Sequence, residues 1–583
     1  MLRIETGLML LALALALGRP ALFAVGGEKI ESGLARLSRR RVLSIMLIAS
    51  SAIALRLILL PVLPIPEPVV HDEFGYLLAA DTFAHGRLTN PTHPLWQHFE
   101  SFSILQKPTY QCFGQPGQGM ILALGKLLFG HPFGGVLLSV AAMCGAITWM
   151  LQGWLGPEWA LIGGILCIAR YGSFCYWANS YWGGSLGAAA GALVLGALPR
   201  IQSAWRTRDA TLMGAGMALL VITRPYEGLV FSLPIAAALV TAIRARTRPP
   251  LRVWLRRTVL PLGLVLGVAV GCQSYYFWRV TGNPFRSPYQ VERETYAVVP
   301  YMAWQHFRPA PAYHNEVMKK MYSEDDPAHY RRFRSFLGQT AYAIVGWSFF
   351  LGPALTAPFL MLFLSLPNDF SVRNICRPTR FLLIVGFVFL LGCALENYYN
   401  PHYSSPATGL ILALTLLAMR QMRRWSPRGV FLSRALPIIC LVTLAVRAAA
   451  VPLNIPLHEF YEFAWHETGV PSFGRQKIQE QLERMPGKHL VMVHYGSNHD
   501  PFFEWVYNEA NIDNAKVVWS RELGSEQDRA LMAYFHDRKV WLLEADRNPP
   551  KLRLVLPQTK QSADIFASKP AMRSKFRNSA EGE

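Results

Sequence analysis

The stretch Arg39–Leu63 reads RRRVLSIMLIASSAIALRLILLPVL, a basic triplet followed by an apolar run that holds a single arginine, Arg56. The run Val42–Leu63 is long enough to cross the hydrocarbon core of a bilayer as a helix, which takes about 20 residues. Lys and Arg gather on the cytoplasmic side of membrane helices. We therefore predict a transmembrane helix that runs from the inside to the outside.

Further apolar runs recur along the chain as far as residue 452. An earlier run, 8–25, is expected to be an uncleaved membrane helix, because the strongest positive charge follows it instead of preceding it as in a signal peptide. The pattern predicts about 11–12 transmembrane helices in all. The later spans are expected near 132–155, 158–176, 183–199, 209–223, 227–243, 258–278, 339–366, 381–396, 407–419 and 435–452.

The distribution of Lys and Arg supports this topology. With Val42 on the inside, the basic connectors at 200–208, 244–257, 373–380 and 420–424 all fall inside as well. The short outer connectors, 178–181 and 397–406, contain no Lys or Arg. This is the asymmetry that orients membrane proteins, and it predicts a multi-pass protein of the inner cell membrane.

The composition agrees with a membrane protein and argues against nucleic acid as a partner. Hydrophobic residues make up 52% of the 583 residues and charged residues only 16%, too few to cover the surface of a soluble protein. The formal net charge is +20. The positive charges lie mainly in short connectors between apolar runs, so they are assigned to membrane topology.

The chain divides into four parts by composition. The expected parts are an N-terminal membrane helix with a basic cytoplasmic linker (1–41), a transmembrane domain (42–452) with outer loops 64–131 and 279–338, an extracytoplasmic α/β domain (453–550), and a basic disordered tail (551–583).

Within the third part, strands are predicted to alternate with helices. Strands are expected at 488–495, 515–520 and 539–544, and helices at 501–510 and 526–537. This order is typical of a small α/β domain with a partly parallel sheet. The predicted fold class is therefore an α-helical polytopic membrane protein with a small C-terminal α/β domain on the outer side.

The first outer loop opens with two adjacent carboxylates, in His71-Asp72-Glu73-Phe74-Gly75-Tyr76. Neighbouring residues of a helix point in different directions, so at most one of Asp72 and Glu73 is expected to react. The alternative is that one of them caps the amphipathic stretch 74–83 at its N-terminus.

Farther along the loop, Asp81 and His85 are four residues apart. They are candidate ligands of a divalent metal, although the surrounding residues match no known ligand spacing. The alternative is that the two side chains pair on one face of a helix. No cofactor is assigned, and a divalent metal stays open.

Other outer connectors are also rich in polar and aromatic residues. The connector Arg224-Pro225-Tyr226-Glu227-Gly228 places an arginine on the outer side, against the general bias. Its alternative role is a snorkelling anchor at the interface. The aromatic cluster 176–182 is interpreted as an interfacial aromatic belt. Polar and aromatic stretches also occur at 282–289, which contains Arg286, and at 400–406, which contains His402 and Tyr403.

Together, these features resemble the GT-C glycosyltransferases. The resemblance covers about residues 40–452 and rests on an inside-to-outside helix, an outer loop that opens with Asp72-Glu73, and about ten further spans. More narrowly, the chain resembles bacterial relatives of the protein O-mannosyltransferases and of the aminoarabinose transferase that modifies lipid A. The stretch 400–406 is similar to the motif that opens a late span in that group.

The resemblance implies an inverting transfer from a polyprenyl-phosphate-sugar donor to a glycan, lipid or protein acceptor at the outer face of the membrane. The first-loop acid would be the catalytic base, which here falls on Asp72 with Glu73 beside it. A carboxylate can take the proton of an attacking hydroxyl, and cations can stabilise a departing phosphate. The candidate substrate-binding residues are Lys107, Arg224, Tyr226, Glu227, Arg286, His402 and Tyr403.

Two rival functions stay open at this point, a lipid or solute transporter and a non-catalytic assembly protein of the envelope. Transporters often contain internal repeats and charged or broken helices near the middle of the membrane. No repeat is evident here, and the polar residues concentrate at the outer face instead. Loss of activity on removing one outer-loop carboxylate from a folded protein would favour an enzyme.

Overall fold

The structure is a computed structural model that describes residues 1–555 except 23, 243–249, 365–374, 425 and 456–471. It separates into two compact units, which are described one at a time. The helical unit contains Met1–His93, Ser101–Phe473 and the short turn Pro501–Glu504. The C-terminal unit contains the remaining residues after 473 together with Pro94–Glu100 of the first loop.

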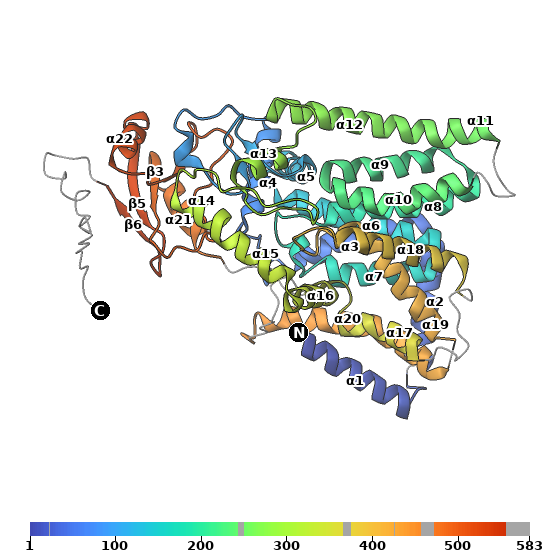
Figure 1. Ribbon diagram of the computed structural model, residues 1–583. Coiled ribbons are helices and arrows are strands. Elements are labelled where there is room, and N and C mark those ends of the chain that lie inside the picture. The colour runs from blue at the N-terminus through green and yellow to red at the C-terminus, as the bar shows by residue number, and fades with distance from the viewer. Residues whose placement is uncertain (23, 243–249, 365–374, 425, 456–471, 556–583) are drawn as a thin grey trace, which may run out of the picture. The chain divides into compact units, whose positions relative to one another are not determined.

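The helical unit is built from helices of widely different lengths (Figure 1). In chain order they are α1 (Leu2–Gly18), α2 (Ala24–Arg39), α3 (Arg41–Ile58), α4 (His71–Ala84), α5 (Pro116–Phe129), α6 (Phe133–Trp154), α7 (Pro157–Tyr171), α8 (Ser185–Ala204), α9 (Thr207–Thr223), α10 (Pro225–Ala242), α11 (Leu251–Trp254), α12 (Leu260–Thr281), α13 (Pro288–Tyr296), α14 (Glu316–Lys319), α15 (Asp326–Arg334), α16 (Phe336–Phe350), α17 (Gly352–Leu364), α18 (Arg377–Cys393), α19 (Thr408–Met422) and α20 (Pro427–Ala450).

Five helical segments in the described part of the chain are long and apolar enough to cross a membrane, judged by length and composition. They are α3, α6, α10, the continuous segment Leu251–Thr281 that contains α11 and α12, and α20. Most of the other predicted spans coincide with shorter helices, such as α7, α9, α18 and α19. The fold class expected from the sequence is confirmed, a mostly helical chain with several apolar helices and a small C-terminal sheet.

The predicted span 339–366 is wrong as a single helix. It breaks into α16 and α17, which meet at an angle of 96°. The break lies at Gly352, which has a φ of +57°, a conformation that residues with a side chain rarely adopt. At this bend Glu5 accepts a hydrogen bond from the backbone N–H of Ala354 at 2.9 Å and forms a buried ion pair with Arg170 at 3.3 Å.

Small residues allow the central helices of this unit to pack closely. Most residues of α8 are buried, and α8 packs against α6, α9 and α19. A Cβ on Gly196 would lie 2.6 Å from the Trp149 ring of α6, and one on Gly191 would lie 2.0 Å from the carbonyl oxygen of Pro406. Such close contact between helices is common in membranes, where small residues line the interfaces.

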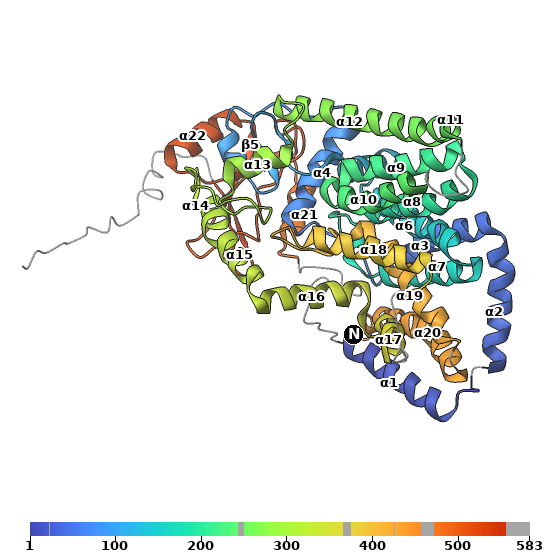
Figure 2. The same cartoon turned by 45° about the vertical axis from the view of Figure 1, so that its right-hand side comes forward.

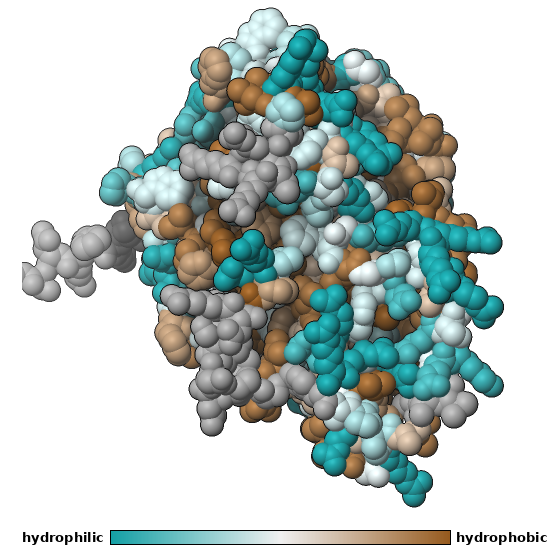
Figure 3. Space-filling view, turned by 90° about the vertical axis from the view of Figure 1, so that its right-hand side faces the viewer, coloured by the Kyte–Doolittle hydropathy of each residue, from teal (hydrophilic) through white to brown (hydrophobic). Residues whose placement is uncertain are grey.

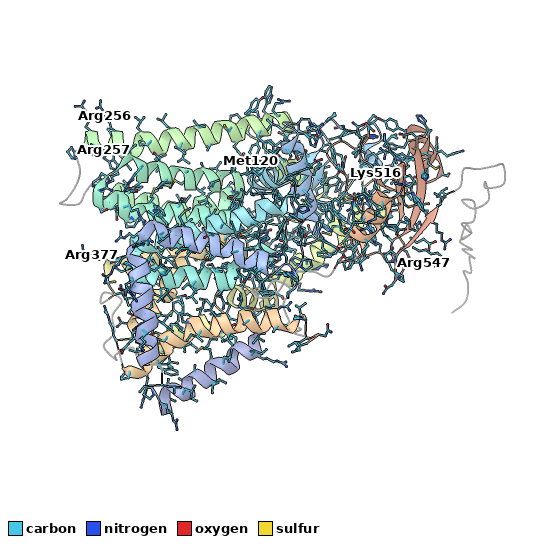
Figure 4. All side chains as sticks on the ribbon, turned by 180° about the vertical axis from the view of Figure 1, so that it is seen from behind. Met120, Arg256, Arg257, Arg377, Lys516 and Arg547 are labelled. Carbon is cyan, nitrogen blue, oxygen red and sulfur yellow. The ribbon has the colours of Figure 1, made fainter. Side chains whose placement is uncertain are left out.

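The basic connectors gather at one end of the helical unit. Arg256, Arg257 and Arg377 all lie at this end (Figure 4), and the surface there carries many hydrophilic residues (Figure 3). The segment 26–41, expected to be a linker, is largely helical and forms most of α2. This helix packs against α3 and α7 and runs across their ends (Figure 2). Glu31 of α2 pairs with Arg423 at the end of α19 at 2.6 Å and with Arg434 of α20 at 2.9 Å, which ties α2 to both of these helices.

The C-terminal unit is a small α/β fold whose four-stranded sheet has the order β4-β3-β5-β6. The strands are β3 (Lys488–His494), β4 (Val517–Arg521), β5 (Arg538–Glu544) and β6 (Lys551–Leu554), and the helices are α21 (Arg475–Arg484) and α22 (Ser525–Tyr534). The strand β3 pairs in parallel with β4 and β5, whereas β6 is antiparallel to β5. The three predicted strands, the helix near 526–537 and the partly parallel sheet are confirmed.

Two expectations for this part of the chain are wrong. The segment 501–510 is not helical, because it forms a turn followed by irregular chain. Residues 551–554, expected to start a disordered tail, form β6 by pairing with β5. The two compact units are not continuous in sequence, since Pro94–Glu100 belongs to the C-terminal unit and Pro501–Glu504 to the helical one. The rest of the predicted tail, 556–583, lies outside the described residues.

Candidate functional site

A cavity of about 980 Å³ opens in the helical unit. Its volume is at the upper end of the range usual for ligand sites. Five parts of the chain form its wall: the start of α4, the connector between α9 and α10, the C-terminal half of α12, the segment around α13, and the connector before α19. Residues that line it include Asp72, Tyr76, Gln115, Val221, Arg224, Tyr226, Glu227, Val270, Gln273, Phe277, Tyr289, Arg293, Tyr301, Arg308, His402 and Tyr403.

The structure thus brings together six of the residues that the sequence singled out. They are Asp72, Arg224, Tyr226, Glu227, His402 and Tyr403. The chain positions of these residues span most of the helical unit, and each lies at or beside a helix end.

Asp72 lies in the first turn of α4, and both of its carboxylate oxygens accept a hydrogen bond. The Ser103 hydroxyl donates to Oδ1 at 2.7 Å, and the indole Nε1–H of Trp182 donates to Oδ2 at 2.8 Å. The two donors are far from Asp72 in sequence and were not predicted. The carboxylate is therefore held in one orientation at the cavity wall, with lone pairs left for a further donor.

Glu73 is turned away from the cavity. Its Oε2 accepts hydrogen bonds from the backbone N–H groups of Val69 and Val70, both at 2.9 Å, and its Oε1 accepts one from the N–H of Tyr181 at 2.8 Å. Burial raises the pKa of Glu73, and these three donors act in the opposite direction. The capping alternative considered for the acidic pair is correct for Glu73, which caps α4.

His71, just before Asp72, is buried and held by a distant segment of the chain. Its Nε2 lies 3.1 Å from the carbonyl oxygen of Pro501 and 3.0 Å from that of Phe502. Two acceptors require a donor between them, so Nε2 carries the hydrogen. The imidazole also stacks on the Phe102 ring at 4.6 Å, and burial lowers its pKa.

Arg224 and Glu227 form the charged part of the cavity wall. The guanidinium lies 3.6 Å from the Glu227 carboxylate and 4.8 Å above the ring centre of Tyr403. Its side chain is 17% exposed, too buried for a headgroup anchor that reaches into water. Burial lowers the pKa of Arg224, but Glu227 and the nearby tyrosines together raise it more, so the guanidinium keeps its charge. Tyr226 donates to the carbonyl oxygen of Gly392 at 2.8 Å, which fixes the connector.

His402 is held by the aromatic cluster 176–182. The Tyr176 hydroxyl lies 2.9 Å from His402 Nδ1 and accepts the His402 backbone N–H at 3.0 Å. Burial, with Arg224 nearby, lowers the pKa of His402 well below its ordinary value. The neutral ring then accepts a hydrogen bond from the Tyr176 hydroxyl at Nδ1 and carries its own hydrogen at Nε2.

The interpretation of residues 176–182 as an interfacial belt is wrong. Tyr176, Trp177, Tyr181 and Trp182 are all buried. They pack inside the helical unit, where Tyr181 contacts Glu73 and Trp182 contacts Asp72. The density of aromatic residues in a connector this short was the available signal, but aromatic residues alone do not distinguish a belt from a packed core.

Two predicted cations do not line the cavity. Arg286 is 44% exposed and pairs with Glu294 on the surface, and Lys107 is also exposed. Three tyrosines that were not predicted, Tyr76, Tyr289 and Tyr301, do line it. Gly114 makes room for the first of them, because a Cβ there would lie 2.8 Å from the Tyr76 ring.

The candidate metal ligands pair with protein groups instead. Asp81 accepts a hydrogen bond from the Lys126 ammonium at 2.6 Å, and its carboxylate lies 3.4 Å from the His85 ring. The i, i+4 pairing considered as the alternative is therefore present. Among the residues that the structure describes, no group of three or more His, Cys, Asp or Glu side chains could hold a metal ion.

Comparisons with known proteins give similarities of fold. No family model matches the sequence, and no curated protein matches it. Two solved proteins are similar to this chain over most of its length. ArnT from Cupriavidus metallidurans in the apo state has a TM-score of 0.49 and 14% identity, covering 85% of this chain and 92% of that one. The apo oligosaccharyltransferase of Archaeoglobus fulgidus has a TM-score of 0.45 and 9% identity, covering 86% and 69%.

Both neighbours also appear with ligands. ArnT bound to undecaprenyl phosphate has a TM-score of 0.46 and 14% identity, covering 85% of this chain and 92% of that one. The archaeal oligosaccharyltransferase AglB in complex with an inhibitory peptide and a dolichol-phosphate has a TM-score of 0.35 and 11% identity, covering 85% and 69%. Since identities this low concern the fold alone, what the cavity does must be inferred from its own residues.

Proposed function

We propose that this chain is a membrane glycosyltransferase that transfers a sugar from a polyprenyl-phosphate-linked donor to an acceptor at the outer face of the membrane. The observation that carries the proposal is that Asp72 and Arg224 line one cavity, a carboxylate fixed by two hydrogen bonds and a guanidinium at a helix end. A base and a cation facing one space are what transfer from a phosphate leaving group to a hydroxyl requires.

The reaction is a single displacement that inverts the anomeric carbon. The oxygen of the acceptor hydroxyl bonds to the anomeric carbon of the donor sugar, while its proton passes to Asp72. The bond between that carbon and the phosphate oxygen breaks, and the leaving polyprenyl phosphate keeps the electron pair. Arg224 is suited to this leaving group because a guanidinium can bind two phosphate oxygens at once.

A lipid-linked donor fits the two kinds of residue that line this cavity. The lining contains apolar residues, such as Val221 of α9 with Val270 and Phe277 of α12, from helices that also expose apolar side chains. It also contains tyrosines and charged residues such as Arg293 and Arg308. A molecule with a hydrocarbon chain, a phosphate and a sugar matches this combination, and the chain contains no glycine-rich nucleotide loop of the Walker type.

The test uses the purified protein reconstituted with a polyprenyl-phosphate-linked sugar. We measure the release of polyprenyl phosphate, which requires no knowledge of the acceptor if a crude envelope extract is supplied. Asp72→Asn should lower the rate about a hundred-fold to ten-thousand-fold, the usual contribution of a general base. The matched control is Asp537→Asn, an exposed carboxylate on the C-terminal unit, which should keep the parent rate. Near-normal turnover by Asp72→Asn would refute the proposal.

The orientation is a separate part of the proposal, because the cavity must face the outer side of the inner membrane. Reporter fusions after residues 70, 250 and 400 test it. We expect an outside signal at 70 and 400 and an inside signal at 250, as the distribution of Lys and Arg predicts. An inside signal at 70 would place Asp72 in the wrong compartment.

A further inference from the structure

We infer that Ser103 and Trp182 are positioning residues that set the orientation of the Asp72 carboxylate. This inference rests on the proposed function, because it assigns a role to the two groups that hold the proposed base. Each carboxylate oxygen has about two lone pairs. One neutral donor on each oxygen prevents the carboxylate from rotating and leaves the other lone pairs for the acceptor hydroxyl.

Ser103 is itself held by the backbone around it. Its φ is +61°, which is uncommon for a residue with a side chain, and its carbonyl oxygen accepts the N–H of Phe113 at 3.1 Å. A Cβ on Gly75 would lie 2.9 Å from that carbonyl oxygen, so a glycine in α4 allows the loop to approach. The strained conformation aims the hydroxyl at Asp72, and strain of this kind is often found at functional sites.

Trp182 is fixed by contacts on several sides. Its backbone N–H donates to the Ser180 hydroxyl at 3.2 Å. Its indole packs against His402 at 4.6 Å and against Tyr176 at 5.6 Å between ring centres. The same tryptophan therefore connects Asp72 to the cavity-lining His402. An indole N–H can only donate, so it interacts favourably with the ionised carboxylate.

Removing either donor should leave the Asp72 carboxylate free to rotate about its side-chain bonds. A base that is out of line with the acceptor hydroxyl takes the proton less well, so kcat should fall. The KM for the lipid-linked donor need not change, because the proposed phosphate contact is made by Arg224 and not by Asp72.

The experiment compares Ser103→Gly and Trp182→Phe with two matched controls in the reconstituted full-length protein. Ser103→Gly suits the positive φ, and Trp182→Phe keeps an aromatic ring beside His402, so each variant removes mainly the donor. The control Ser101→Ala removes a buried hydroxyl that makes no hydrogen bond within the described residues. The control Trp177→Phe shortens a buried indole that packs on Tyr171 and Phe349.

We expect kcat to fall roughly ten- to a hundred-fold in each test variant, as for one hydrogen bond to a charged group. The KM for the lipid-linked donor should stay within about twofold of the parent value, because a positioning residue acts on the chemical step and not on donor binding. The two controls should keep the parent kcat and the parent KM. If one test variant does not fold, the other carries the test alone.

Parent kcat in a folded test variant, or a fall in kcat matched by an equal rise in the KM for the donor, would overturn the inference. Loss of turnover in Asp72→Asn would still leave the proposed function standing. Normal turnover by Asp72→Asn would instead refute the proposed function itself, so the two failures are distinguishable.

Discussion

Asp72 and Glu73 are adjacent in the chain, yet only Asp72 lines the cavity. The Asp72 carboxylate accepts two side-chain hydrogen bonds and keeps lone pairs free, whereas Glu73 is 2% exposed and is closed off by three backbone N–H groups. The two residues therefore separate a chemical role from a structural one within a single turn of α4.

Replacement of Glu73 should harm stability more than chemistry. In Glu73→Gln, one oxygen becomes an NH₂ group, which would face backbone donors and leave at least one of them unpaired. We expect a loss of about 1–3 kcal/mol in the free energy of unfolding. The thermal midpoint in detergent measures it, and the folded fraction should keep a substantial rate. A variant as inactive as Asp72→Asn but fully stable would contradict this division of roles.

Arg224→Lys should weaken donor binding although it keeps the positive charge. Lysine cannot bind two phosphate oxygens with one planar group, and it loses the packing over Tyr403. We expect a loss of about 1–3 kcal/mol in binding free energy, which is roughly a 5- to 150-fold rise in Kd for the donor. Arg224→Ala, which also removes the charge, should raise the Kd for the donor at least as much. Isothermal titration with the lipid-linked sugar provides the measurement.

The exposed arginine Arg286 is the comparison for that series. It does not line the cavity, although its partner Glu294 does, so Arg286→Ala should weaken donor binding much less than Arg224→Ala. Parent-like binding in Arg224→Lys and Arg224→Ala would mean that another group holds the phosphate.

Glu292 of α13 should make stability depend on pH. Burial raises the pKa of Glu292 from 4.5 to about 7, and the carboxyl contacts the Tyr322 hydroxyl. Between these values the unfolded chain releases a proton that the folded chain keeps. The stabilisation from Glu292 is therefore fully present below pH 4.5 and is lost as pH rises through 7. The full difference is about 3 kcal/mol.

Glu292→Gln cannot ionise and should remove this dependence. The thermal midpoint of the variant should exceed that of the parent at pH 8 and match it near pH 5. Glu316→Gln, at a side chain that is 88% exposed, is the control and should shift neither midpoint. An equal gain for Glu292→Gln at both pH values would argue against a buried, protonated carboxyl.

Gly191→Ala in α8 should displace the part of the cavity wall that the connector before α19 forms. The added methyl would lie 2.0 Å from the carbonyl oxygen of Pro406, so the connector that carries His402 and Tyr403 must move. Such overpacking typically costs about 1–3 kcal/mol, and transfer should slow with it. The control is Gly267→Ala in α12, where no atom lies within 4 Å. If Gly191→Ala matched Gly267→Ala in midpoint and rate, close packing of α8 would not be what positions the connector.

Much of the site could be predicted because its residues lie beside helix ends. An apolar run is a local signal, and the placement of Lys and Arg assigns each connector to one side. Asp72, Arg224 and His402 were therefore expected on the same side of the membrane, and the structure places them on one cavity. The same rule led us to expect Arg286 at the site, although it does not line the cavity. Charge bias assigns a residue only to one side of the membrane, which is a much larger region than a cavity.

What could not be predicted depends on contacts between distant segments. The donors to Asp72 lie 31 and 110 residues away in sequence, and no periodicity pairs them. The break of the span near 339–366 needed knowledge that Gly352 adopts a positive φ beside Glu5 and Arg170. The strand β6 was missed because its charged sequence becomes a strand only by pairing with β5.

The turn Pro501–Glu504 bears on how such a protein can evolve. It lies beyond residue 473, yet its two carbonyl groups accept the hydrogen bond from His71, next to the proposed base. A recombination that joined these helices to a foreign tail would leave that imidazole N–H buried without its acceptors, at a cost of about 1–3 kcal/mol. The gene segments for the helices and for the tail are therefore expected to be inherited together. A chimera with an exchanged tail should fold stably only if the new tail keeps this turn.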